Sequence, residues 1–410
     1  MPATVVDRLG ELSQLGRYAG GIDRGLGTPQ ERAARERFAA WARGAGYVLA
    51  QDRVGNLFAR RAGTRAGAAP ILVGSHLDTV KTGGAYDGAY GVAGALCALE
   101  LLDRRNVTTA HPIEAVAWVG EEGSRFPLGC LGSAVFAGLT SADEALALTD
   151  ESGTSLRDAL ERGEGGFLPS VPQRANDGVA GYLELHVEQG PILERAGIRL
   201  GIVTAIAGQR RVRVTIEGAS GHAGTVPMTM RSDSLCAAAE IILALEAASR
   251  AAEPSVVTVG RLSLEPGSTN VIPRRVIFTV DMRAPEDPQV DAVERALQSA
   301  VTRAQEQRSV RVAIETLERR TATPMEPRMR DAVRRAANST GEHCIDVPSG
   351  AGHDTMCIAT VAPVAMLFVP SIGGVSHVGE ERTSDADLQL GVETLAAAIV
   401  EVDRMLAAEG

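Results

Sequence analysis

Residues 74–88 have the sequence Gly-Ser-His-Leu-Asp-Thr-Val-Lys-Thr-Gly-Gly-Ala-Tyr-Asp-Gly and lie between two apolar segments. The run before it, residues 69–73, predicts a buried strand, and the apolar run after it predicts a buried helix. The loop therefore follows the carboxyl end of a strand, where open α/β sheets bind their ligands. His76 offers an imidazole to a metal, Asp78 can orient that ring, and Asp87 can bridge two cations. The alternative is a solvated turn rich in glycine and aspartate, and this loop alone does not exclude it.

Composition limits the class of protein. A chain of 410 residues exceeds what one core usually supports, which predicts two domains. Hydrophobic residues at 45% and charged residues at 22% are typical of a soluble globular protein. The net charge of −10 argues against nucleic acid and anionic membranes as partners, and no apolar run reaches the roughly 20 residues that span a bilayer.

The five cysteines are odd in number and widely spaced, which predicts buried thiols in a reducing compartment and no thiolate metal site. The first ten residues lack the basic start and apolar core of a signal peptide. We therefore expect a cytoplasmic protein.

A second predicted strand, residues 112–119, is followed by the adjacent pair Glu121 and Glu122. Side chains of adjacent residues leaving a strand diverge, so one glutamate can bind metal while the other faces a reacting water. An isolated pair of glutamates is usually a surface feature. A role in metal binding and catalysis is nevertheless favoured for this pair, because it follows a strand as His76 does.

Two later predicted strands also lead into polar side chains. Residues 182–190 include His186, and the strand at residues 365–369 precedes His377. A lone histidine in a strand usually has a structural role, but these are the third and fourth such clusters. The four clusters together supply nitrogen and carboxylate donors for two cations, and zinc, manganese, cobalt and nickel accept such ligands. The ligand candidates are His76, Asp87, Glu121 or Glu122, His186 and His377.

The pattern changes at residue 208, where strictly alternating strands begin. The predicted order is β-α-β-β-α-β, the ferredoxin-like split unit. The predicted strands cover residues 210–217, 255–264, 275–283 and 309–316, and the helices cover 232–251 and 288–308. We therefore expect an inserted domain at 208–320 within a metal-binding domain made of 1–207 and 321–410.

Eight segments carry a family resemblance that extends over residues 20–405. They are Gly74–Val80, Gly84–Gly88, Glu121–Phe126, His186–Gly190, Gly221–Gly224, Ser268–Pro273, Asp281–Arg283 and Ser376–His377. In order and spacing they resemble the N-carbamoyl-L-amino acid amidohydrolases and the allantoate amidohydrolases. Both groups belong to the aminoacylase and carboxypeptidase-like dinuclear metal amidohydrolases.

The resemblance implies an α/β fold, in which a mixed-sheet catalytic domain carries an inserted ferredoxin-like lid and dimerisation domain, and a homodimer formed through that insert. It implies one metal at His76, Asp87 and His186, and a second metal at Asp87, Glu122 and His377. The match of Glu121 is the general base, and the match of Asp78 orients the first histidine. His186 marks the carbamoylase and allantoate branch, because peptidase-like members usually carry an acidic residue there.

The resemblance also implies substrate contacts from Gln189, His222, Asn270 and Arg283. His222 is expected to stabilise the oxyanion, in its own or in the neighbouring subunit's site. The guanidinium of Arg283 could hold an α-carboxylate through two hydrogen bonds.

The expected reaction is hydrolysis of a linear amide C–N bond, converting an N-carbamoyl-L-amino acid and water to the amino acid, carbon dioxide and ammonia. The nearest alternative is an allantoate or related ureide amidohydrolase. An aminoacylase or dipeptidase is disfavoured by His186 and Gln189. A catalytically silent, metal-stabilised binding protein would lack the base or a ligand, and this sequence has both. His353 and Asp354, in a Gly-His-Asp match, are expected to have a supporting role.

Overall fold

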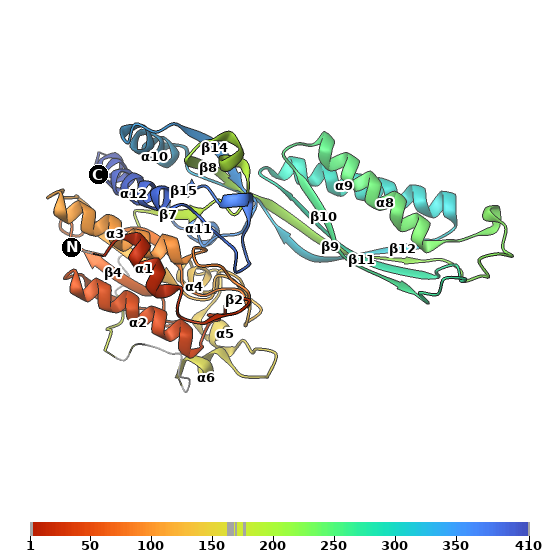
Figure 1. Ribbon diagram of the computed structural model, residues 1–410, viewed down its shortest axis with the longest axis horizontal. Coiled ribbons are helices and arrows are strands. Elements are labelled where there is room, and N and C mark those ends of the chain that lie inside the picture. The colour runs from red at the N-terminus through yellow and green to blue at the C-terminus, as the bar shows by residue number, and fades with distance from the viewer. Residues whose placement is uncertain (1–2, 162–167, 169, 175–177, 409–410) are drawn as a thin grey trace. The chain divides into compact units, whose positions relative to one another are not determined.

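The computed structural model describes residues 3–161, 168, 170–174 and 178–408, and it divides the chain into two compact units (Figure 1). Unit 1 comprises Met1–Thr204, Met325–Val347 and Gly352–Gly410. Unit 2 comprises Ala205–Pro324 and Pro348–Ala351.

Unit 1 is built on a mixed sheet with the strand order β8-β15-β7-β5-β6-β4-β3. The four central strands, β15, β7, β5 and β6, are parallel to one another, and β8, β4 and β3 pair antiparallel. The strands are β3 (Val48–Gln51), β4 (Leu57–Arg61), β5 (Ile71–His76), β6 (Ile113–Trp118), β7 (Gly181–Val187), β8 (Leu200–Ile206) and β15 (Val364–Val369), and β14 (Cys344–Ser349) pairs with β8. Every residue of β5, β6, β7 and β15 is buried, as expected for parallel strands covered on both faces.

Helices surround this sheet and share its core. Helices α3, α10 and α12 pack against its strands, and α1 packs on α3 and α12. The helices of unit 1 are α1 (Val5–Leu12), α2 (Pro29–Gly44), α3 (Ala89–Arg104), α4 (Leu131–Phe136), α5 (Ala142–Ala147), α6 (Leu156–Glu161), α7 (Ile192–Ala196), α10 (Pro327–Ser339), α11 (Thr355–Ile358), α12 (Asp385–Ala407) and the 3₁₀ turn η2 (Ile372–Gly374). Within the described residues of the chain, none of the helices combines the length and the apolar sequence needed to cross a bilayer.

Two local predictions needed correction. The sequence also predicts helix over residues 1–45, and this prediction is wrong between α1 and α2. There β1 (Arg17–Tyr18) and β2 (Gly21–Ile22) form a small antiparallel pair, because this segment is rich in glycine, which disfavours helix. Strand β5 continues to His76 instead of ending at residue 73. It continues because Gly74 fits against β6, where a Cβ would lie 2.0 Å from the carbonyl oxygen of Val116.

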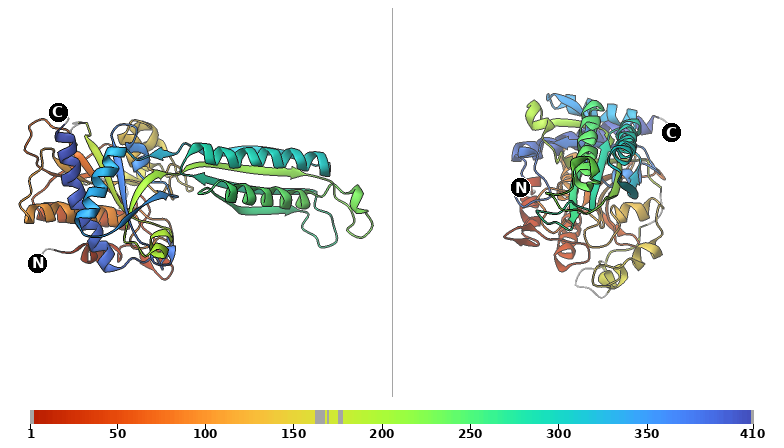
Figure 2. Two further views of the ribbon diagram at one scale, coloured as in Figure 1. Left: turned by 90° about the horizontal axis from the view of Figure 1, so that it is seen from above. Right: turned by 90° about the vertical axis from the view of Figure 1, so that its right-hand side faces the viewer.

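Unit 2 contains a four-stranded antiparallel sheet with the order β10-β11-β9-β12. Its elements follow the order β-α-β-β-α-β along the chain, and Figure 2 shows the two long helices running along the strands. They are β9 (Gly208–Glu217), α8 (Ser234–Ala251), β10 (Val256–Glu265), β11 (Arg275–Ala284), α9 (Asp287–Arg308) and β12 (Arg311–Arg320), with the short η1 (Met228–Met230) and β13 (Thr323–Pro324). Side chains alternate between buried and more exposed along β11, and its buried side chains share one core with α8 and α9.

Candidate metal centre

Four neighbouring parallel strands bring the candidate site residues to one edge of the unit 1 sheet. In sheet order these strands are β15, β7, β5 and β6, and each leads into one polar cluster. Strand β5 ends at His76, and His186 is the second-last residue of β7. Because the carboxyl ends of parallel strands share an edge, side chains far apart in the sequence become neighbours.

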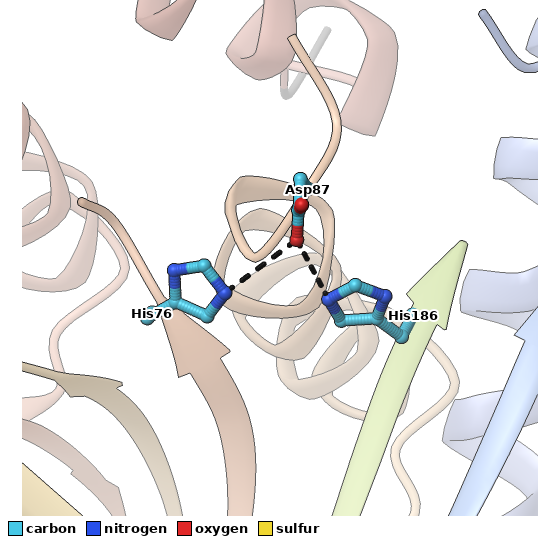
Figure 3. Close-up of side chains that lie close together, drawn as sticks. All are labelled: His76, Asp87 and His186. Carbon is cyan, nitrogen blue, oxygen red and sulfur yellow. Dashed lines mark ion pairs between the residues drawn. The ribbon is translucent and has the colours of Figure 1, made fainter. Parts of the chain in front are cut away.

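Asp87 lies at the centre of this cluster, and its two oxygens face different partners. Its Oδ1 lies 3.6 Å from Nε2 of His76 and 3.2 Å from Nε2 of His186 (Figure 3). Its Oδ2 lies 3.1 Å from Nε2 of His377, which is 3.7 Å from Oε2 of Glu122. Two groups of potential ligands therefore meet at one carboxylate: His76, Asp87 and His186 on one side, and Asp87, Glu122 and His377 on the other.

The hydrogen bonds of the two buried histidines direct their Nε2 atoms toward Asp87. Nδ1 of His76 lies 3.0 Å from the carbonyl oxygen of Asp78, and Nδ1 of His186 lies 2.8 Å from that of Val187. A carbonyl accepts only, so each Nδ1 carries a proton, and in the neutral form of each ring it is Nε2 that presents a lone pair. The backbone N–H of Gly88 donates to Nε2 of His186 at 3.2 Å, which requires the same tautomer. Imidazole nitrogens held in this way are suited to bind a metal ion.

Asp78 has a wider role than orienting His76. Its Oδ1 accepts from the backbone N–H of Glu121 at 3.1 Å, and its Oδ2 accepts from that of Glu122 at 3.2 Å. Oδ1 of Asp78 also lies 3.6 Å from Nδ1 of His76, whereas the main-chain carbonyl oxygen of Asp78 lies 3.0 Å from that nitrogen. The carboxylate of Asp78 therefore holds the backbone of the glutamate pair in place, while its main-chain oxygen orients the histidine.

The two glutamates point to different neighbours. Oε2 of Glu121 lies 3.7 Å from Nε2 of His76, and its Oε1 accepts a hydrogen bond from Sγ of Cys130 at 3.4 Å. Burial raises the pKa of Glu121 to about 7, against the opposing effect of His76. Oε2 of Glu122 instead faces His377, and burial together with the charge of Asp87 raises its pKa well above the usual value. Glu122 thus faces the ligand group that includes His377, and Glu121 remains near His76 as a group able to exchange a proton.

A third group of potential ligands, Glu184, His186 and His353, also lies close together. Glu184 is a poor metal ligand here because Oε1 accepts from Oγ of Ser75 at 2.7 Å, and Oε2 accepts from the N–H and the hydroxyl of Thr355 at 3.1 and 2.6 Å. The ring of His353 packs against that of His186, with centroids 4.6 Å apart, and burial with the nearby His186 holds the pKa of His353 well below its usual value. The arrangement supports the strand that carries His186.

Gln189 belongs to the same centre, and Glu381 is a neighbour that the sequence analysis missed. Gln189 has φ of 58°, and its Nε2 donates to Oδ2 of Asp87 at 2.9 Å. Glu381 is buried and accepts hydrogen bonds from the backbone N–H groups of Tyr86 and Asp87. The sequence signal for Glu381 was an acidic pair shortly after His377, which by itself is typical of a surface segment.

In unit 2, His222 and Asn270 lie on adjacent loops. His222 forms an isolated β-bridge with Val271, and the N–H of Ala223 donates to the carbonyl oxygen of Asn270 at 3.0 Å. His222 and Asn270 are both exposed, and Nδ1 of His222 accepts from the N–H of Gly224 at 3.0 Å.

Arg283 is engaged within unit 2 more fully than the sequence analysis expected. Its Nε and Nη2 donate to the carboxylate of Asp281 at 2.9 and 3.1 Å, and its Nη1 donates to the carbonyl oxygen of Gly350 at 2.7 Å. One edge of the guanidinium is therefore occupied by Asp281. These bonds leave one N–H on each Nη atom for an additional acceptor.

Comparison with known proteins identifies the relatives of the chain. The model of peptidase family M20/M25/M40 matches residues 72–401. The chain is 40% identical to the N-carbamoyl-L-amino acid amidohydrolase of Geobacillus stearothermophilus over 95% of both chains. It is 39% identical to the allantoate amidohydrolase of Bacillus subtilis (strain 168), covering 96% of this chain and 95% of that protein.

Among solved structures, the chain resembles an amidase of the hydantoinase/carbamoylase family from Burkholderia multivorans, with a TM-score of 0.92, 36% identity and 97% of both chains covered. These findings confirm the mixed α/β fold and the resemblance inferred from the eight sequence segments. The chain therefore belongs to peptidase family M20/M25/M40, and its relatives in that family include amidohydrolases that act on N-carbamoyl-L-amino acids and on allantoate.

Proposed function

We propose that this protein is a dinuclear metal amidohydrolase that hydrolyses the terminal amide bond of a ureido acid, and that its substrates are N-carbamoyl-L-amino acids. The observation that carries the proposal is the position of Asp87, whose two oxygens face two different groups of nitrogen and carboxylate donors. A relative that is 40% identical over 95% of both chains is named for this activity.

Amidohydrolases of this family are metal-dependent, and the residues of the candidate centre fit divalent ions. The donors are imidazole nitrogens and carboxylate oxygens, which suit zinc, manganese, cobalt or nickel. We assign His76, Asp87 and His186 to one ion, and Asp87, Glu122 and His377 to the other. Ions held by these residues would supply Lewis-acid chemistry, which polarises a carbonyl and makes water more acidic.

The chain's own side chains supply proton transfer and substrate positioning in this proposal. Glu121 takes a proton from the attacking water and delivers it to the leaving nitrogen. Asp78 keeps Glu121 in place through the backbone hydrogen bond at 3.1 Å. Gln189 contacts the substrate near Asp87.

We assign the remaining substrate contacts to unit 2. His222 stabilises the oxyanion, and Asn270 and Arg283 bind the substrate's polar groups, with the two unused N–H groups of Arg283 directed to its carboxylate. The lid and homodimer roles of the inserted domain, residues 208–320, remain part of this proposal and rest on the family resemblance. We also infer a cytoplasmic location, because all five cysteines are free thiols.

Hydrolysis of allantoate is the second candidate function. It is favoured by the relative from Bacillus subtilis (strain 168), which is 39% identical over 96% of this chain. Allantoate and N-carbamoyl-L-amino acids share a terminal ureido group and a carboxylate, so the same metal centre and base would serve both.

The test is hydrolysis by the manganese-loaded protein of N-carbamoyl-L-amino acids and allantoate, followed as ammonia release, and of N-acetyl-amino acids, followed as release of the free amino acid. Turnover of the carbamoyl series is the expected result, and turnover of allantoate alone would assign the protein to the second candidate. Glu121→Gln should abolish turnover, whereas Glu151→Gln, at an exposed glutamate of the same unit, should not. Activity only on N-acetyl-amino acids, or none on any of the three, would contradict the proposal.

A further inference from the structure

Glu381 is a buried carboxylate that joins two loops of unit 1. It is 3% exposed. Its Oε2 accepts hydrogen bonds from the backbone N–H groups of Tyr86 and Asp87 at 2.9 and 3.1 Å. Its Oε1 accepts from Oγ of Ser376 at 2.7 Å. One side chain therefore holds the loop that carries Asp87 and the loop that carries His377.

The packing around Glu381 leaves little freedom for this side chain. A Cβ added at Gly84 would lie 2.2 Å from Oε2 of Glu381, so the Asp87 loop lies in direct contact with the carboxylate. A second link joins the same two segments, because Oγ1 of Thr82 donates to the carbonyl oxygen of His377 at 3.3 Å. The distance between the two loops is therefore set by Glu381 and its immediate neighbours.

We propose that Glu381 is a positioning residue that fixes Asp87 and His377 relative to one another, and that it thereby sets the affinity for the second metal ion. The proposal rests on the dinuclear centre proposed above. His76 and His186 face the other oxygen of Asp87 and make no hydrogen bond to Glu381 among the contacts of the described residues. The effect of losing Glu381 should accordingly be larger at the ion held by His377.

The chemistry of the contacts predicts which substitutions are tolerated. A glutamine keeps one oxygen to accept from the two backbone N–H groups, and its amide N–H can donate to Oγ of Ser376, since a hydroxyl also accepts. A leucine of similar size offers no acceptor, so the two buried N–H groups would lose their partner. Glu381→Gln should therefore restore most of what Glu381→Leu loses. Glu380, the exposed neighbour, provides the matched control as Glu380→Leu.

The experiment titrates each metal-free protein with manganese and counts bound ions by elemental analysis. We expect wild type, Glu380→Leu and Glu381→Gln to bind two ions, with the glutamine variant within a few-fold of wild type. In Glu381→Leu one of the two sites should lose about tenfold or more in affinity, while the other site changes less. Unchanged affinity at both sites in Glu381→Leu would overturn the proposal, as would equal losses in the leucine and glutamine variants.

Hydrogen exchange in the metal-free proteins separates this inference from the proposed function. The amides of Tyr86 and Asp87 should exchange faster in Glu381→Leu than in wild type, and unchanged exchange would overturn the positioning role whether or not metal binds. A wild type that binds fewer than two ions would instead contradict the dinuclear centre. If Glu381→Leu does not fold, Ser376→Ala removes one of the three contacts of the carboxylate. That variant should weaken the same metal site several-fold, and wild-type affinity would refute the inference.

Discussion

Replacement of Asp78 by asparagine tests how the base is held in place. Both oxygens of Asp78 accept backbone hydrogen bonds, from Glu121 at 3.1 Å and from Glu122 at 3.2 Å. In either orientation, an asparagine amide presents an N–H₂ group to one of these two N–H groups, so one hydrogen bond is replaced by two opposed donors. The backbone of the glutamate pair should then shift away from its present position.

The expected size of the effect follows from the kind of bond that is lost. A hydrogen bond to a charged group contributes about 1.5–3 kcal/mol, and each 1.4 kcal/mol changes a rate about tenfold, so kcat/KM should fall about 10- to 150-fold. Arg24, which is fully buried near Asp78, also loses a compensating charge. The free energy of unfolding should therefore fall as well, and activity must be expressed per folded, metal-loaded molecule.

The assay for Asp78→Asn measures ammonia release, bound manganese and the unfolding transition on the same preparation. Asp143→Asn makes the same change of charge in an exposed ion pair with Arg53 and should leave all three quantities near wild type. An asparagine variant that keeps more than half of the wild-type kcat with full metal content would show that the carboxylate of Asp78 does not position the glutamate pair.

Three further substitutions test the metal centre and the packing of unit 1. Gly88→Ala would bring a Cβ to 2.4 Å from the ring of His76 at a residue with φ of 63°, so we expect weaker metal binding and a loss of about 1–2 kcal/mol from the backbone alone; wild-type metal affinity would contradict the packing argument. His186→Ala should lower the number of bound ions and abolish turnover. The control His343→Ala, at an exposed histidine, should do neither. Full metal occupancy with unchanged turnover in His186→Ala would refute the ligand assignment. Asp403→Asn disturbs a buried carboxylate that accepts three hydrogen bonds. The free energy of unfolding measured with denaturant should therefore fall by about 1–3 kcal/mol, while kcat per folded molecule is retained. An unchanged denaturation midpoint would contradict this prediction.

The elements that carry the candidate metal centre could be predicted because they obey a simple rule of sheet topology. His76, Glu122, His186 and His377 each come from a sequence position close after, or at the end of, an apolar strand. The structure gives these strands consecutive places in the sheet. Parallel strands with a common direction bring their carboxyl ends to one edge, so the sequence pattern was sufficient to gather the side chains. The central position of Asp87 could not be derived in this way, because it depends on the path of the loop.

Features created by long-range contact could not be predicted from local sequence. Glu381 lies next to Glu380, and nothing in the residues around them distinguishes the buried glutamate from the exposed one. The same holds for the carboxylate of Asp281, which occupies one edge of Arg283. In both cases a tertiary contact decides the role of the side chain, and a single sequence does not contain that information.

The loop before α3 is rich in glycine, but these glycines do not indicate a flexible loop. A Cβ at Gly84 would strike Glu381, one at Gly83 would lie 2.7 Å from Cβ of Thr79, and one at Gly88 would meet the ring of His76. Each of these glycines lies in close contact with another part of unit 1, so the lack of a side chain permits packing at short distance. The loop that presents Asp87 is therefore held by its neighbours, and alanine at these positions should displace the ligands instead of merely stiffening the chain.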